Sequence, residues 1–231
     1  MMNKVFLSQL ISLVLASVLL TFSACNNDSK TSTSPTTQQP EAKPEVANNK
    51  KTILFFGNSL TAAYGLDQEQ GFPALIQEKI NAINKPYQVI NAGVSGETSA
   101  GGLGRIDWML KSKVDVFVLE LGGNDGLRGI KTTATKQNLQ GIITKVQTKY
   151  PDCKIVLAGM EAPPNMGKEF TDAFRNVFVS LAKENNITLL PFLLDNVAGE
   201  TELNLPDGIH PNIEGQKIVA NNVWEVLETI L

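Results

Sequence analysis

Residues 53–61 read Ile-Leu-Phe-Phe-Gly-Asn-Ser-Leu-Thr, an apolar run that ends in a polar turn. The run at 53–56 is continuous and apolar, which is typical of a parallel strand buried on both faces. Comparable runs lie at 114–119 and 155–157, and weaker ones at 88–90 and 188–190. Segments with helical periodicity separate these runs, at 74–83, 103–110, 139–146, 170–181 and 218–226. This alternation predicts an α/β domain whose parallel sheet is covered by helices on both faces.

The turns that follow the predicted strands are polar or rich in glycine. They comprise residues 57–61, 91–96 and 122–125, together with 207–210 between the last strand and the last helix. In open parallel sheets, ligands bind beyond the carboxyl ends of the strands. We therefore expect all four turns on one rim of the sheet, where their side chains can form a single site.

The chain has one histidine, His210, three residues after Asp207. A carboxylate at that spacing can accept a hydrogen bond from one ring nitrogen and leave the other to act as a general base. Ser59, in the turn after the first strand, is the candidate nucleophile. Two simpler interpretations stay open: His210 is a structural residue held by Asp207, and Ser59 caps a following helix.

Acyl transfer also needs hydrogen-bond donors for the developing oxyanion. Gly93 can bring a backbone N–H close to a substrate, and the Asn124 side chain adds a neutral donor. Taken singly, each residue is better explained as a turn glycine or an Asx-type turn residue, and only together with Ser59, Asp207 and His210 do they indicate an oxyanion site. The turn around Ser59 is not the Gly-x-Ser-x-Gly elbow of α/β-hydrolases, because Thr61 stands where the second glycine would be, and that fold is disfavoured.

Four blocks of the chain resemble those of the SGNH, or GDSL, hydrolases. They read Gly57-Asn-Ser-Leu-Thr-Ala-Ala-Tyr-Gly-Leu66, Asn91-Ala-Gly-Val-Ser-Gly-Glu-Thr98, Gly122-Gly-Asn-Asp-Gly-Leu-Arg-Gly129 and Asp207-Gly-Ile-His210. The similarity covers residues 51–231 and is greatest to the exported arylesterase, acyl-CoA thioesterase and lysophospholipase group. It implies a flavodoxin-like, three-layer α/β/α sandwich around a five-stranded parallel sheet.

The same resemblance implies a role for each site residue. Ser59 would be the nucleophile, His210 the base and Asp207 its orienting carboxylate. The oxyanion hole would consist of the backbone N–H groups of Ser59 and Gly93 and the side chain of Asn124. An acyl pocket would lie along the same rim, bordered by the segment after Asn124 and by the later Pro-Pro segment, and no cofactor would be required.

The resemblance predicts a serine esterase that hydrolyses carboxylic esters or thioesters through an acyl-enzyme on Ser59. Asn58 departs from the family pattern, which usually has Asp before the serine; it keeps hydrogen-bonding capacity but removes a charge. Two alternatives stay open. One is removal of O-acetyl groups from a polysaccharide. The other, which Asn58 favours, is a catalytically silent lipoprotein that binds a ligand on the same rim.

The N-terminal 24 residues are interpreted as a lipoprotein signal peptide. Lys4 precedes an apolar stretch, and small residues precede Cys25, although Phe22 matches the usual cleavage site poorly. Cys25 would be lipidated, and residues 25–50, which have few large apolar side chains, predict a disordered tether. The alternative is an uncleaved membrane helix. We expect an exported protein anchored in the bacterial cell envelope, facing the periplasm or the surface, with its hydrolase domain at 51–231.

Composition narrows the possible partners. A formal net charge of −3 and a pI near 5.3 give no basic footprint for nucleic acid. One histidine and one spare cysteine are too few for a zinc site of the usual kind, so no metal is expected. Cys153 would have no intrachain partner and is expected to be buried. The expected partners are a small or lipid-like ester and the membrane, and the domain is expected to be a monomer.

Overall fold

The computed structural model describes residues 50–231. The predicted signal peptide, Cys25 and residues 26–49 of the predicted tether lie outside the described residues. Within the described part of the chain, no helix combines the length and the apolar character needed to cross a membrane.

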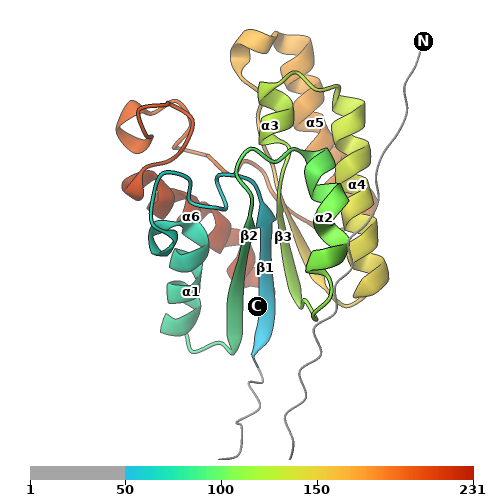
Figure 1. Cartoon of the computed structure of the whole chain (residues 1–231), viewed down its shortest axis with the longest axis vertical. Coiled ribbons are helices and arrows are strands. Elements are labelled where there is room, and N and C mark those ends of the chain that lie inside the picture. The colour runs from blue at the N-terminus through green and yellow to red at the C-terminus, as the bar shows by residue number, and fades with distance from the viewer. Residues whose placement is uncertain (1–49) are drawn as a thin grey trace, which may run out of the picture. The chain divides into compact units, whose positions relative to one another are not determined.

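Five parallel strands form one sheet in the order β2-β1-β3-β4-β5 (Figure 1). They are β1 (Lys51–Gly57), β2 (Tyr87–Gly93), β3 (Val116–Glu120), β4 (Lys154–Ala158) and β5 (Thr188–Leu190). The strands β1, β3 and β4 are almost wholly buried, as their continuous apolar runs predict. The chain order reverses direction between β1 and β3, which is where such sheets bind ligands.

Helices cover both faces of the sheet. α1 (Phe72–Ala82) packs with α6 (Ile213–Leu227) on one face, as Figure 1 shows. α2 (Ser99–Met109), α4 (Thr132–Lys149) and α5 (Lys168–Asn185) pack side by side on the other face. The predicted fold class, a three-layer α/β/α arrangement with a five-stranded parallel sheet, is confirmed.

Two elements differ from the sequence prediction. β2 continues through Gly93, so residues 91–93 belong to the strand and not to the turn that follows it. Most residues of this edge strand are exposed or half-buried, so the strand lacks the continuous apolar run that would reveal its length in the sequence. Its backbone nevertheless pairs with β1 as far as Gly57 and Gly93. The short helix α3 (Gly123–Leu127) was not expected, because five residues that include two glycines are too few to show a helical period.

Aromatic packing fixes β1 from both sides. Phe55 and Phe56 are fully buried and, as neighbours in a strand, point to opposite faces of the sheet. The Phe55 ring meets Phe72 of α1 edge-on with centroids 5.5 Å apart, and the Phe56 ring lies 5.6 Å from that of Phe117 in β3. The turn that carries Ser59 therefore leaves the sheet from a rigid support.

Candidate active site

The turn after β1 places Ser59 at the carboxyl edge of the sheet. Gly57 ends the strand, and a Cβ there would lie 2.1 Å from Thr61 Oγ1 and 2.5 Å from Glu120 Oε2, so only glycine fits. Ser59 is buried, with 8% of its surface exposed. After Ser59 the chain runs through turns and a short 3-10 helix (Gln68–Gln70), capped by Asp67, before α1 begins at Phe72, so Ser59 does not cap a helix. The interpretation of Ser59 as a helix cap is wrong.

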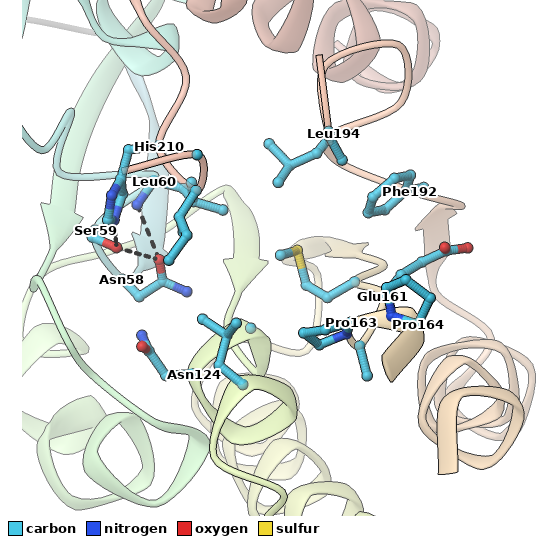
Figure 2. Close-up of a pocket in the computed structure, with 18 residues that line it drawn as sticks. Asn58, Ser59, Leu60, Asn124, Glu161, Pro163, Pro164, Phe192, Leu194 and His210 are labelled. Atoms are coloured by element: carbon cyan, nitrogen blue, oxygen red, sulfur yellow. Dashed lines mark hydrogen bonds between the residues drawn. The ribbon is translucent and has the colours of Figure 1, made fainter. Parts of the chain in front are cut away.

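Ser59, His210 and Asp207 form a continuous hydrogen-bonded chain. His210 Nε2 lies 2.8 Å from Ser59 Oγ, and His210 Nδ1 lies 2.6 Å from Asp207 Oδ2. Figure 2 shows the imidazole directed at the serine hydroxyl from the loop between β5 and α6. Because Ser59 and His210 are 151 positions apart in sequence, their contact depends on the fold and not on a local turn.

The loop that carries His210 is itself tightly held. Asp207 Oδ1 accepts hydrogen bonds from the backbone N–H groups of Ile209 and His210, at 2.9 and 3.0 Å. Burial acts to raise the pKa of Asp207, but these two backbone donors and the His210 ring outweigh it and lower the pKa to about 2. Asp207 is therefore a carboxylate at any pH near neutrality, and it can hold the Nδ1 proton of the imidazole.

Asn124 and the Ser59 backbone offer hydrogen-bond donors beside this chain. Asn124, the second residue of α3, donates one Nδ2 hydrogen to the carbonyl of Glu97 at 3.0 Å and lines the cavity next to Ser59. That bond crosses to another segment, so Asn124 is not merely a local turn residue. In the stretch 50–231, the Ser59 N–H has no hydrogen-bond acceptor.

Gly93 occupies a different position from the one predicted. Its N–H is donated to Asn91 Oδ1 at 2.9 Å, and Gly93 is not among the residues that line the cavity. A Cβ on Gly93 would lie 2.3 Å from the Ala62 backbone nitrogen, so this glycine lets the end of β2 approach the chain after Ser59. Gly93 is therefore not free to act as the donor predicted for it.

Gly96, in the turn between β2 and α2, was not singled out from the sequence, and it offers a backbone N–H that Gly93 does not. It adopts φ +79°, and its carbonyl accepts a hydrogen bond from Arg128 Nη2 at 3.1 Å. The next carbonyl, that of Glu97, accepts the hydrogen bond from Asn124, so the 96–97 segment lies next to Asn124. Across residues 50–231 the Gly96 N–H has no acceptor. The Ser-Gly pair in this block indicates such a turn, because a glycine after the end of a strand readily adopts a left-handed conformation.

An apolar cavity of about 590 Å³ opens beside Ser59 and His210. Figure 2 shows Phe192 and Leu194 facing Ser59 and His210 across it, with Pro163 and Pro164 beside them. Most of the lining side chains are apolar: Leu60, Leu127, Met160, Ala162, Pro163, Pro164, Phe192, Leu194, Ala198 and Ile209. The site therefore has a reactive polar end and a hydrophobic end large enough for a hydrocarbon chain. No cluster of three or more His, Cys, Asp or Glu side chains in residues 50–231 is arranged to hold a metal ion.

Comparison with known proteins identifies the family. Residues 55–218 match the GDSL-like Lipase/Acylhydrolase family. The chain belongs to this family. It is 40% identical over 182 residues to esterase TesA of Pseudomonas aeruginosa, which covers 78% of this chain and 90% of TesA. It is 36% identical over 181 residues to thioesterase 1/protease 1/lysophospholipase L1 of Escherichia coli K12, covering 78% and 85% of the two chains.

Solved structures of GDSL-like hydrolases agree with this assignment. The crystal structure of TesA superposes with a TM-score of 0.75, covering 78% of this chain and all of that one. AlinE4, an SGNH-hydrolase family esterase, is 36% identical and superposes with a TM-score of 0.65 over 79% of this chain and 97% of its own. The predicted resemblance is confirmed, and the chain is an ester-hydrolysing serine hydrolase.

Proposed function

We propose that Ser59 is the nucleophile of this hydrolase, that His210 is its general base and that Asp207 orients the imidazole. The observation that carries the proposal is the hydrogen-bonded chain from Asp207 Oδ2 through His210 to Ser59 Oγ, with distances of 2.6 and 2.8 Å. Asp207 fixes the tautomer in which Nδ1 keeps a proton and Nε2 is left to accept one.

Ester cleavage then follows in two steps. Ser59 Oγ bonds to the substrate carbonyl carbon while His210 Nε2 takes its proton, and the carbonyl π electrons move onto oxygen. The oxyanion collapses, the bond to the alcohol or thiol breaks, and the leaving group takes the proton from His210. Water attacks the acyl-enzyme in the same manner and releases the carboxylic acid and free Ser59.

The oxyanion is stabilised by the Ser59 N–H, the second Nδ2 hydrogen of Asn124 and the Gly96 N–H. This assignment replaces Gly93 by Gly96, because the Gly93 N–H is already bonded to Asn91. Preorganised neutral donors of this kind are typically worth about 3–4 kcal/mol of transition-state stabilisation each.

The substrate class is an ester or thioester with an apolar acyl chain. The cavity beside Ser59 is lined mainly by aliphatic, proline and aromatic side chains, which match a hydrocarbon and offer few partners for sugar hydroxyls. This lining disfavours a polysaccharide O-acetylesterase, whose substrate would leave most of the cavity empty. A lysophospholipid, a long-chain acyl thioester and an aryl ester all share the required acyl end.

Hydrolysis of p-nitrophenyl esters by the purified full chain tests the proposal. We expect octanoate to be cleaved with a higher kcat/KM than acetate, and Ser59→Ala to remove both activities. If the wild type and Ser59→Ala are equally slow on both esters, on acyl thioesters and on acetylated sugars, the catalytic assignment is wrong. That result would favour the alternative of a catalytically silent protein that binds a ligand on the same rim.

A separate proposal concerns location. We propose that residues 1–24 direct export and that lipidated Cys25 anchors the enzyme to a membrane of the cell envelope through the tether at 25–50. The support is the sequence pattern before Cys25 and the polar composition after it. Cys25→Ala should move the protein from the membrane to the soluble fraction without changing kcat, and retention of the variant in the membrane would refute lipidation at this residue.

A further inference from the structure

Glu120 is a fully buried carboxylate directly beneath the Ser59 turn. It is the last residue of β3, and its oxygens accept four hydrogen bonds from the turn after β1. Asn58 donates its backbone N–H to Oε2 at 3.0 Å and its Nδ2 to Oε1 at 2.7 Å. Thr61 donates its Oγ1 to Oε2 at 2.8 Å and its backbone N–H to the same oxygen at 3.3 Å. One side chain from β3 therefore sets the path of the turn on both sides of Ser59.

Asn58 passes this restraint on to the nucleophile. Its Oδ1 accepts the backbone N–H of Leu60 at 3.0 Å and lies 3.4 Å from Ser59 Oγ (Figure 2). The orientation of the amide is fixed, because Nδ2 faces a carboxylate and Oδ1 faces an N–H. Turning the amide over would place two acceptors together at Glu120 and two donors together at Leu60.

The charged groups around the turn do not neutralise Glu120. On the α2 side, Arg105 donates to the Gly57 carbonyl and pairs with Glu97. On the cavity side, the Asp207 and His210 pair contacts Ser59. Within residues 50–231, Glu120 makes no ion pair, so its four donors are all neutral groups. Burial raises the pKa of Glu120 to about 7, against those hydrogen bonds, which favour the carboxylate.

We infer that Glu120 is a positioning residue that holds Ser59 in its reactive orientation through Asn58, and that the two side chains act as one pair containing one amide and one acid. The inference rests on the proposed role of Ser59 as nucleophile. It explains how Asn58 is accommodated where the family usually has Asp: the amide supplies a donor to Glu120 that an aspartate could supply only by holding a proton between two carboxyl groups. The polarity of the pair is exchangeable, provided that one of the two side chains donates a hydrogen to the other, either from an amide or from a proton shared by two carboxyl groups.

Exchange of the two functional groups gives the sharpest test. In Glu120→Gln, the NH₂ group of the new amide must face another donor, either Asn58 Nδ2 or the N–H groups of Asn58 and Thr61. Turning over either amide only moves this conflict between two donors to another place. In the double variant N58D/E120Q, the amide nitrogen introduced at position 120 can donate to the carboxylate introduced at position 58. The carbonyl oxygen of the same amide then takes the place of Oε2 and accepts the other three hydrogen bonds. The double variant has the same charge and nearly the same volume as the wild type.

The experiment measures kcat and KM of the full chain on p-nitrophenyl octanoate at pH 8. We expect E120Q to lower kcat by about 10²-fold with little change in KM, because displacing a reacting group by about 1 Å costs that much. N58D/E120Q should recover at least about tenfold of this loss, and N58D alone should stay active. An E120Q variant with kcat within about twofold of the wild type, or a double variant no faster than E120Q, would overturn the inference.

A matched control separates positioning from general instability. Gln216 is a buried polar residue of α6 whose Oε1 accepts the Phe72 backbone N–H at 2.9 Å. Gln216→Leu should lower Tm without lowering kcat, whereas E120Q lowers kcat at temperatures where it remains folded. If E120Q is insoluble, a soluble and active N58D/E120Q supports the pairing, and a double variant that is inactive or equally insoluble refutes it.

The Ser59→Ala and E120Q variants test the role of Ser59 and the role of Glu120 separately. If Ser59→Ala retains full activity, Ser59 is not the nucleophile, and the proposed function fails whatever the Glu120 variants do. If Ser59→Ala is inactive while E120Q is fully active, the proposed function stands and only the positioning role of Glu120 is refuted.

Discussion

The phenol ring of Tyr64 packs on the imidazole of His210, with ring centroids 4.5 Å apart and planes inclined by 38°. Tyr64 follows the turn that carries Ser59 and is half exposed, so its ring covers one face of the imidazole. An aromatic ring in this position restrains the orientation of the imidazole.

Replacing Tyr64 tests this restraint. Tyr64→Leu should lower kcat by up to about tenfold, because aromatic contacts of this kind are worth about 0.5–1.5 kcal/mol. Tyr64→Phe keeps the ring and should retain near-wild-type kcat. Steady-state kinetics on one ester decide the matter, and equal rates for the Leu and Phe variants would show that the contact has no catalytic effect.

Replacing Asp207 tests the orientation of His210. Asp207→Asn removes the carboxylate that accepts the Nδ1 proton, and the corresponding change in other serine triads lowers kcat by about 10⁴-fold through the wrong tautomer. We expect a large loss in kcat with little change in thermal stability, because Asp207 lies on an exposed loop. A near-wild-type rate would remove Asp207 from the mechanism.

The cavity predicts how acyl-chain preference can be changed. Ala162 lines the apolar end of the cavity and is 8% exposed. Ala162→Phe should fill this end and lower kcat/KM for octanoate more than for acetate, which does not reach it. Val179→Phe, at an exposed position of α5, is a matched control that should leave the octanoate-to-acetate ratio unchanged. An unaltered ratio in Ala162→Phe would place the acyl chain elsewhere.

Glu120 also predicts how stability varies with pH. Its pKa is about 7 in the folded protein against an ordinary value of 4.5, so between these values the folded state binds a proton that the unfolded state has lost. Its contribution to the free energy of unfolding is therefore present at low pH and decreases as the pH rises toward about 7. Urea unfolding measures the free energy of unfolding of the wild type and of E120Q between about pH 5 and 8. Subtracting one from the other at each pH removes the contributions of the other titrating groups, and we expect this difference to change with pH. A pH-independent difference would contradict it.

The environment of Cys153 predicts that its thiol reacts slowly. It is half-buried, and burial together with the nearby Asp115 carboxylate raises its pKa to about 12. Because the thiolate is the reactive species, a disulfide reagent at neutral pH should label Cys153 far more slowly in the folded Cys25→Ala variant than in urea. Equal rates in the two conditions would show that the thiol is freely accessible. The expectation that Cys153 is buried holds only in part, because its side chain packs against the core at the surface.

The sequence was sufficient to predict that Ser59, Asp207 and His210 lie together, for a physical reason. Parallel strands all end at one edge of a sheet, so residues after separate strands meet there however far apart they are in the chain. To predict that Ser59 and His210 meet, it was enough to know where β1 ends and that the last loop follows β5. An error of one or two residues in a strand boundary does not move either residue to another edge of the sheet.

The glycines and Glu120 depended on finer detail. Gly93 and Gly96 lie in one block, and only the extension of β2 to Gly93 shows which N–H is already bonded. Glu120 follows a buried apolar run, and nothing in its neighbours along the chain indicates that four donors 59–62 positions away surround it. Sequence patterns report periodicity along one element, whereas these roles arise from the approach of two elements.

The sequence separation between Ser59 and His210 has a consequence for the folding of the chain during its synthesis. Ser59 lies in the turn after the first strand, whereas His210 lies in the loop between the last strand and the last helix. A chain that has emerged only as far as β5 carries a serine without its imidazole and cannot hydrolyse an ester. With Ser59 and His210 in their proposed roles, activity therefore begins only when the C-terminal segment docks and brings the imidazole to the serine hydroxyl.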